Sequence, residues 1–332
     1  MSTTRIFYQV LSLQNGPTPA TGYHFSTGFN NVYTGSNSGN NLIQSFERMQ
    51  SVTDDFSIER QNVNQLGQLA IVSREITTPP TVNLGGSWIV ADVSNDRKLG
   101  LYVSGDSSAL TNILNRTQAD KNYFIGIAPQ GQDNVNYTGS KQCILVSNAN
   151  LASWSTEASV GNLPTTTFSV QGFNWATYTG SFNQPLNAID TTNGNPITGI
   201  NFSLPVVPSG IAPTASALRP TDITLNLSNA AIGLSLSDIK PQSYNISFDL
   251  NLQPLNKLGS LYPYSREPQF PVTVSTSVTA YFGDLITGSL RNVLCADSSY
   301  SLVYTLNDPC GGGQAVVYTL NGMKIDGQSF GA

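Results

Sequence analysis

The sequence predicts a mainly β protein made of two related domains in tandem, each mostly β with one helix. Three observations predict this class. One long stretch is written twice, apolar and polar residues alternate with the period of a strand, and only 11% of the residues are charged. A period of two is typical of a strand with one buried face. Since charged residues usually make up about a quarter of a globular protein, this composition is typical of β proteins buried in assemblies, and equally of β-rich secreted domains.

The repeat is long and contains no gap. The stretch "NVNQLGQLAIVSRE" returns much later in the chain as "PLNKLGSLYPYSRE". When residues 50–92 are compared with residues 242–284, a shift of 192, 15 of the 43 positions are identical. A repeat of this length is too long for a solenoid unit and indicates two folding units of ordinary size.

A second match closes each copy. The stretch "FSVQGFN" at 168–174 is similar to "YTLNGMK" at 318–324, now with a shift of 150. The change of shift places 42 additional residues in the first copy, between Asp92 and this second match. We therefore expect one domain at 1–182 and a linker with the second domain at 183–332.

The first expected strand is "IFYQVLSL", and a polar loop follows it over residues 30–41. The segment Gln50–Arg60 is ambiguous between helix and strand when read alone. Its copy alternates apolar residues with period two, at Tyr244, Ile246, Phe248 and Leu250. The second copy thus predicts a strand in both places, and the Leu-Gly pair that follows each one marks a turn or bulge.

Each copy continues with a strand that opens with proline and ends at aspartate, "PTVNLGGSWIVAD" and "PVTVSTSVTAYFGD". A helix is expected next, at Ser107–Arg116 in the first copy and at 284–297 in the second. The strands "NYFIGIAP" and "YSLVYTL" follow, and "NLPTTTFSVQGFNWATYTG" completes the first domain. Residues 181–220 are rich in Pro, Gly, Asn and Ser, which predicts a linker and the entry to the second domain.

No pattern in the chain predicts catalysis, a cofactor or a metal ion. His24 is the single histidine and has no nucleophile motif to accompany it. The segment Asp92–Asp96 has the spacing of a calcium loop only in part. The glycine-rich Cys310–Gln314 has no lysine and no following helix, so it is not a phosphate loop. We therefore expect no enzyme, with no catalytic, cofactor-binding or metal-binding residue.

The cysteines and the chain ends predict a reducing compartment. Cys143 lies in the apolar stretch "QCILV" and is expected in a buried strand. Cys295 and Cys310 could pair, but free thiols are the simpler interpretation. The first residues carry no apolar leader, and no apolar run is long enough to span a membrane, so we expect no membrane anchor.

Charge distinguishes the repeated "SRE" from the rest of the chain and limits the possible partners. The net charge is −5 and no run of Lys or Arg occurs, so tight binding of nucleic acid is not expected. Arg74 with Glu75 and Arg266 with Glu267 are the candidate contact residues, forming salt bridges between neighbouring domains or subunits. The alternative is that each pair only closes the end of a strand.

These stretches are similar to the tail tube proteins of long-tailed bacteriophages. The resemblance rests on "QSVTDDFSIERQNVNQLGQLA", "PPTVNLGGSWIVAD" and "SVGNLPTTTFSVQGFNW" in the first copy. It rests on "QSYNISFDLNLQPLNKLGSL" and "VVYTLNGMKIDG" in the second. It implies two β-barrel or sandwich domains, each with a flanking helix, related to the tubes of type VI secretion.

The resemblance also implies the function. In that family six domains form a ring, rings stack into a tube, and viral DNA passes through the channel without sticking. Two domains per chain would let three chains close a pseudo-hexameric ring. The alternative is a ring of six chains. The expected partners are the chain itself and other tail proteins. The expected place is the virion tail, assembled in the bacterial cytoplasm, with Arg74, Glu75, Arg266 and Glu267 at contacts between domains or rings.

Two other functions stay open at this point. One is another structural protein of the virion, such as a capsid decoration or baseplate component, which would form a finite oligomer that does not stack. The other is a carbohydrate-binding or carbohydrate-cleaving β protein, which would need exposed aromatic side chains such as Trp154, Trp175 and Tyr178. Core or interface packing is the favoured interpretation of these three aromatic residues.

Overall fold

The fold is mainly β, as the sequence predicts. The computed structural model describes residues 8–17, 44–102, 108–115, 121–131, 141–180, 186–189, 196–202, 217–227, 239–259, 263, 265–282, 300–308 and 313–329. Strands dominate these residues and the helices are short. The described strands form open antiparallel sheets, and no closed barrel is found among them.

The largest sheet contains ten strands and includes strands of both copies. Its main path runs β2 (Gln44–Ser45), β1 (Tyr8–Pro17), β7 (Lys121–Pro129), β8 (Lys141–Ser159), β9 (Asn162–Gly172), β6 (Thr81–Ile89) and β3 (Met49–Ser57). Three more strands branch from it: β10 (Asn174–Gly180), β14 (Ile239–Asp249) and β17 (Val274–Phe282). The second copy therefore enters the sheet of the first copy through β14.

The 19-residue strand β8 joins two layers of this sheet. Its first half pairs with β7 and β10, and its second half pairs with β9 and β14. Between the halves, Asn148 adopts a left-handed backbone conformation, with φ 46°, which asparagine tolerates better than most residues. The bend lets one strand serve a layer of β1, β7 and β10 and a second layer of β3, β6, β9, β14 and β17.

Aromatic side chains fill the space between these two layers. Phe46 stacks on Phe168 with ring centroids 5.9 Å apart, and Trp88 lies 5.4 Å from the same ring. Tyr123, from β7 in the other layer, lies 6.3 Å from Phe46. Gly86 keeps this cluster close to β6, because a Cβ there would lie 2.8 Å from the Phe168 ring. The second copy contributes to the same hydrophobic cluster through Phe248 and others.

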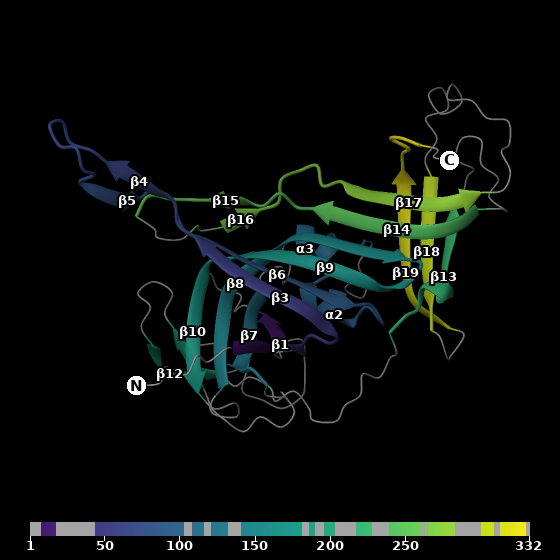
Figure 1. Cartoon of the computed structure of the whole chain (residues 1–332), viewed down its shortest axis with the longest axis horizontal. Coiled ribbons are helices and arrows are strands. Elements are labelled where there is room, and N and C mark those ends of the chain that lie inside the picture. The colour runs from purple at the N-terminus through teal and green to yellow at the C-terminus, as the bar shows by residue number, and fades with distance from the viewer. Residues whose placement is uncertain are drawn as a thin grey trace.

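Smaller sheets complete the described fold (Figure 1). A three-stranded sheet of β13 (Ile223–Leu227), β18 (Tyr300–Asn307) and β19 (Gln314–Met323) crosses β14 and β17. The hairpin of β4 (Arg60–Val63) and β5 (Ser73–Ile76) projects from the body, whereas that of β15 (Gln253–Leu255) and β16 (Ser265–Glu267) lies along it. A further hairpin joins β11 (Leu186–Ile189) and β12 (Pro196–Phe202). The helical segments are α2 (Ser94–Leu99), α3 (Thr111–Leu114) and the 3₁₀ turn η1 (Pro220–Asp222).

The repeat seen in the sequence is present in the structure as identical strand registers. In the β3–β6 hairpin Phe56 lies opposite Val82, and in the β14–β17 hairpin Phe248 lies opposite Val274, each residue 192 positions later. Both hairpins carry an irregularity at the matched glutamines, between Met49 and Ser51 and between Pro241 and Ser243. The β4–β5 and β15–β16 hairpins also share one register: Gln61 faces Glu75, and Gln253 faces Glu267.

The second match of the sequence is preserved in register but not in location. In the β8–β9 pair Trp154 faces Phe168, and in the β18–β19 pair Tyr304 faces Tyr318, each 150 positions later. The first pair continues into β6, whereas β18 and β19 form their separate sheet with β13. That sheet packs on β14, where the rings of Tyr244 and Tyr304 lie 4.7 Å apart. The domain boundaries at 1–182 and 183–332 stay a prediction.

Several expected elements are confirmed and others need correction. The predicted strands are present as β1, β3, β6, β7, β9, β10, β14, β17 and β18, and the Leu-Gly turns have Gly67 and Gly259 at positive φ. The first copy has two short helices and not one, because α2 follows Asp92 directly and α3 forms only four residues of the expected Ser107–Arg116 helix. Residues 181–220 are not a plain linker, since they contain the β11–β12 hairpin. The helix at 284–297, the loop at 30–41, His24, Cys295 and Cys310 lie outside the described residues.

Candidate functional site

A row of hydroxyl side chains crosses the six strands β3, β6, β9, β8, β14 and β17. The strand registers place these residues directly opposite one another in turn, from both copies: Ser51, Ser87, Thr167, Ser155, Ser247 and Ser275. Neighbouring positions in each strand point to the other face, where the aromatic core lies. The row is therefore on the face of the sheet that turns away from the core.

The hydroxyl groups of this row bond to one another across the strands. The Ser51 and Ser87 Oγ atoms are 2.7 Å apart, and Ser155 Oγ lies 2.6 Å from Thr167 Oγ1. One hydroxyl of each pair donates to the other. The hydroxyl row therefore forms a polar surface of short, uncharged side chains.

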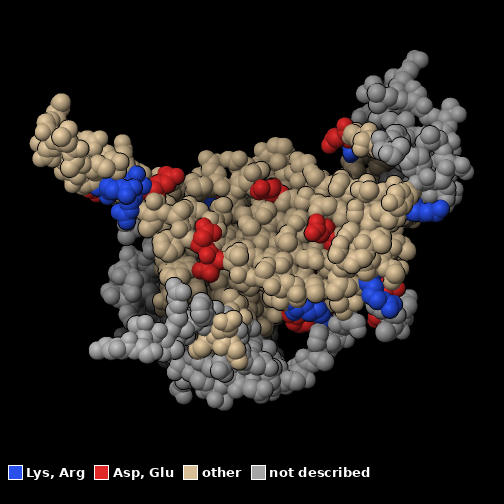
Figure 2. All heavy atoms as spheres, in the orientation of Figure 1, with Lys and Arg blue, Asp and Glu red and all other residues tan. Residues whose placement is uncertain are grey.

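The charges that flank the row are acidic. Glu157 on β8 and Asp249 on β14 lie at the outward positions two residues from the row. Asp55 on β3 lies four residues from it and accepts a hydrogen bond from Asn83 Nδ2 at 3.2 Å. Among the described residues of these six strands, the outward positions within two residues of the row hold no lysine or arginine; Lys240, at the start of β14, lies opposite Tyr281 on the same face. In Figure 2 acidic side chains are scattered over the middle of the molecule, whereas Lys and Arg lie toward its margins.

The two copies meet along β8 and β14, and this contact is extensive. Seven residues of β14 pair with β8, and the ring of Phe248 stacks on that of Trp154 at 5.6 Å. The backbone N–H of Leu250 donates to the Ala152 carbonyl at 2.8 Å. Phe248 is 8% exposed and Leu250 is fully buried. Such a contact combines main-chain pairing with a desolvated apolar centre, as a stable protein interface does.

The β15–β16 hairpin extends this contact beyond β14. The Arg266 guanidinium lies over the ring of Phe173, 4.4 Å from its centroid, and the residue is 2% exposed. Phe173 lies between β9 and β10 of the first copy, so this cation–π contact joins the two copies. On the same strand the Ser265 hydroxyl donates to Glu267 Oε1 at 2.6 Å. Of the four candidate contact residues, the structure thus places Arg266 at a contact between the copies.

The equivalent surface of the first copy is exposed. Phe56, the counterpart of Phe248, is 53% exposed, and Ile58, the counterpart of Leu250, is 37% exposed. Arg74 is likewise exposed, in contrast to the buried Arg266. No strand among the described residues pairs with the outer edge of β3. The β3–β4–β5 segment therefore carries counterparts of the contact residues of β14–β15–β16, and these counterparts are much more exposed.

The projecting β4–β5 hairpin also ends in apolar side chains. Leu66 and Leu69 at its tip are fully exposed, and Ile71 and Val72 are each 51% exposed. Arg74 and Glu75 are consecutive on β5 and point to opposite faces of the hairpin. The two side chains therefore do not share one face of the hairpin. Exposed apolar tips of this kind mark surfaces that meet a partner.

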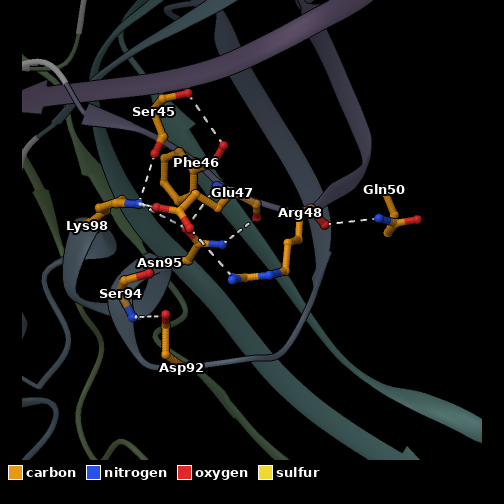
Figure 3. A network of polar contacts seen from close by, with 9 residues as sticks. All are labelled: Ser45, Phe46, Glu47, Arg48, Gln50, Asp92, Ser94, Asn95 and Lys98. Atoms are coloured by element: carbon orange, nitrogen blue, oxygen red, sulfur yellow. Dashed lines mark hydrogen bonds and ion pairs between the residues drawn. The ribbon is translucent and has the colours of Figure 1, made fainter. Parts of the chain in front are cut away.

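A polar network fixes the start of β3 against α2 (Figure 3). Lys98 Nζ donates to the Ser45 carbonyl at 2.9 Å and lies 3.5 Å from Glu47 Oε1. Asn95 Nδ2 donates to the Glu47 carbonyl, and the Glu47 N–H donates back to Asn95 Oδ1. Burial lowers the pKa of Lys98, whereas Glu47 and Asp92 act in the opposite direction. No sequence pattern predicted α2, whose first residues overlap the end of Asp92–Asp96, the segment considered as a calcium loop.

The tryptophans take structural positions. Trp154 is 3% exposed, and its Nε1 donates to Asp96 Oδ1 at 2.8 Å. Trp175 Nε1 donates to Asp54 Oδ2 at 2.7 Å, and its ring lies 5.6 Å from that of Phe56. Packing is thus confirmed as the role of Trp154, which is too buried for a sugar platform. The side chain of Tyr178 lies outside the described residues.

Searches for other kinds of site and for relatives give no assignment. Among the described residues no group of His, Cys, Asp and Glu could hold a metal ion, and none of their helices is long and apolar enough to cross a membrane. Cys143 is buried in β8 as predicted, and burial raises the pKa of its thiol to about 12. No protein-family model matches the sequence, and no curated protein matches it significantly.

Proposed function

We propose that this chain is the structural subunit of a bacteriophage tail tube, in which copies close into rings and the rings stack around a channel for DNA. The observation that carries the proposal is the shared contact surface of the two copies. One surface, β14–β15–β16, is already covered inside the chain, and its counterpart, β3–β4–β5, is exposed. A chain that contains one filled contact and one open contact of the same kind can continue head to tail.

Ring closure accounts for the duplication. Each chain provides two similar domains, so three chains would supply the six domain positions of a pseudo-hexameric ring. Head-to-tail contacts of this kind either close into a ring or continue as a filament. Closure also covers the edges of β3 and of its partner, which would otherwise recruit unrelated strands.

The hydroxyl row supports the assignment of a channel face. The row runs across the strands through both copies, so each chain of a ring would contribute a continuous stretch of hydroxyl side chains to the channel face. Its flanking charges, Asp55, Glu157 and Asp249, repel phosphate, and the lysine on the same face, Lys240, lies at the start of β14, seven residues from Ser247 of the row. DNA is held mainly through phosphate contacts with Lys and Arg, so this face would let it slide.

The projecting hairpin supports contact with further copies or other tail proteins. Its exposed Leu66 and Leu69 form an apolar tip that extends beyond the body of the chain (Figure 1). In the assembled virion tail, put together in the bacterial cytoplasm, burial of this tip would add to the contacts within or between rings. We assign no catalytic activity or cofactor to the chain.

Electron microscopy of a matched pair of variants tests the proposal. Ile58→Lys places a charge at the centre of the exposed contact surface, where the counterpart Leu250 is fully buried. We expect the wild type to form stacked rings of three chains at high concentration, and Ile58→Lys to stay monomeric, because an unpaired buried charge opposes association. Ring mass from light scattering gives the number of chains.

The control is Asn115→Lys, which adds the same charge at the exposed end of α3. It should assemble like the wild type. A wild-type protein that forms only a finite oligomer without stacking would favour another virion component, such as a decoration or baseplate protein. Normal rings from Ile58→Lys would show that this surface is not the contact.

A further inference from the structure

The strand β13 occupies on β18 the place that β14 occupies on β8. Ile246, Ser247 and Phe248 of β14 lie opposite Thr156, Ser155 and Trp154 of β8 in the first copy. The β18 residues 150 positions later, Leu306, Thr305 and Tyr304, lie opposite Ile223, Thr224 and Leu225 of β13. Both arrangements are antiparallel, and in both the other edge is filled by the following strand, β9 or β19. β13 is therefore a substitute for a β14-like strand.

The substitute makes a smaller contact than β14. Within the described part of the chain, which ends on this side at Leu227, five residues of β13 pair with β18, whereas seven residues of β14 pair with β8. Ile223 and Leu225 are only partly buried, while Ile246 and Phe248 are 2% and 8% exposed. Ring stacking of the Phe248–Trp154 kind also has no counterpart in Leu225. A longer strand with an aromatic residue at the right position would make the better partner for β18.

The strand β3 has these properties, and contacts with its own chain fix its position. It is the register-matched copy of β14, and it is nine residues long. Its Phe56 corresponds to Phe248 and is exposed. Lys98 and Asn95 fix the residues just before it, and Trp175 holds Asp54 within it. Such pre-organisation lowers the entropy lost on binding.

We propose that the edge of β18 covered by β13 is the acceptor for β3 of a second copy of this chain, and that β13 leaves this edge when the chains join. The proposal rests on the head-to-tail assembly proposed above and identifies its acceptor. The repeat fixes the register: Phe56 lies opposite the partner copy's Tyr304, and Asp55 lies opposite its Thr305. The exposed Ile58 then lies beside the partner copy's Leu302, the counterpart of Ala152, as Leu250 lies beside Ala152 within one chain.

Because β13 must leave β18 before β3 of another chain can pair there, we expect assembly to be cooperative. β13 belongs to the same chain as β18, so its effective concentration at the edge is high. A single β3 from another chain competes poorly with β13 for the edge of β18. When a ring closes, β3 replaces β13 at every contact between chains in one step. Free chains would therefore resist premature association, and a preformed ring would accelerate growth.

A disulfide that locks β13 in place tests this exchange. Thr224 and Thr305 lie directly opposite each other, and such pairs have Cα atoms about 4.5–5.5 Å apart, within the range that a disulfide bridges. In a chain with Cys295→Ser and Cys310→Ser, we add Thr224→Cys and Thr305→Cys. Oxidised protein should give at least tenfold fewer rings in electron micrographs than the same protein after reduction.

The matched control locks the corresponding pair between β14 and β8. Ser247→Cys with Ser155→Cys joins β14 to β8 at the equivalent register position, and that contact is retained on assembly. Its rings should be equally abundant in the oxidised and the reduced state. Equal ring formation by the oxidised Thr224–Thr305 lock would overturn the proposal while leaving the tube function intact.

A cross-link between chains tests the register directly. Chains with Asp55→Cys are mixed with chains that carry Thr305→Cys, in the same cysteine-depleted background, and oxidised after assembly. We expect a covalent dimer on a non-reducing gel, and none when Asn115→Cys replaces Asp55→Cys. Rings without this cross-link would overturn the proposed acceptor alone. Failure of the reduced and wild-type proteins to form rings would overturn the tube function with it.

Discussion

At the scale of the residue, the buried carboxyl group of Asp96 is the most unusual feature. Asp96 lies on α2, is fully buried, and accepts a hydrogen bond from Trp154 Nε1. Burial raises its pKa from 3.8 to about 7, which outweighs the lowering by the Trp154 hydrogen bond. The folded state then binds a proton more tightly than the unfolded state. Stability therefore falls as pH rises from about 4 to about 7 and changes little from this group above that range.

We expect Asp96→Asn to remove most of this pH dependence. Asparagine keeps the acceptor oxygen for Trp154 and carries no charge, so the variant should exceed the wild type in stability at pH 8 by at least about 1 kcal/mol. Urea unfolding of the monomer at pH 5 and pH 8 measures the difference. The control, Asp54→Asn, changes the partly exposed carboxylate that binds Trp175 Nε1 and should keep the wild-type pH dependence. An unchanged slope in Asp96→Asn would contradict this assignment.

At the scale of the element, two hairpins with the same register have different surroundings. β15–β16 lies against the first copy, with Arg266 buried over Phe173. β4–β5 projects from the chain, with Arg74 exposed at the matching position. The local sequence and pairing are alike, so the difference comes only from what each hairpin meets. Arg266 therefore contributes to a contact within the chain, whereas Arg74 is exposed and available to the assembly that we propose.

We expect alanine substitutions to separate these two roles. Arg266→Ala should lower the free energy of unfolding of the monomer by about 1–2 kcal/mol, because it removes a buried cation–π contact and its packing. Arg74→Ala should change it by less than about 0.5 kcal/mol, as exposed substitutions usually do, and should reduce ring formation. Denaturant unfolding and electron microscopy provide the two readouts. Similar destabilisation by both variants would contradict the distinction.

At the scale of the whole molecule, one sheet unites the two copies and gives them a common face. Strands β3, β6, β9, β8, β14 and β17 follow one another across the chain, and their registers align the hydroxyl row. The face combines small neutral side chains with Asp55, Glu157 and Asp249. The low overall charge and the net charge of −5 agree with large subunit contacts and a surface that repels DNA.

We expect Ser155→Lys to turn this face into one that retains DNA. Ser155 lies near the middle of the hydroxyl row, so assembled tubes would gain one positive charge per chain toward the channel. Tubes should still form, and they should retain several times more double-stranded DNA than the wild type at low salt. Retention should fall as salt rises, because phosphate contacts release counterions. Co-sedimentation measures it, and no excess over Asn115→Lys tubes would contradict the channel assignment.

The sequence by itself determined the class of the fold and the repeat. Alternation at Tyr244, Ile246 and Phe248 identified a strand, because strand periodicity depends only on which face is buried. The repeated "SRE" and Leu-Gly predicted matched hairpins, and the registers agree. The short helix α2 escaped prediction, because its six residues contain one buried leucine and no helical apolar period.

Only the tertiary structure decided how the copies are used. The β14–β17 and β3–β6 hairpins share one register but differ in burial. β14 pairs with the edge of β8 within the chain, whereas no described strand pairs with the outer edge of β3. The hydroxyl row depends on the registers of five strand pairs, each set by long-range contacts that no local pattern specifies. The pairing of β13 with β18 could not be predicted from the sequence either. The apolar residues of a short strand indicate that it is a strand, but they do not specify which neighbouring strand it pairs with.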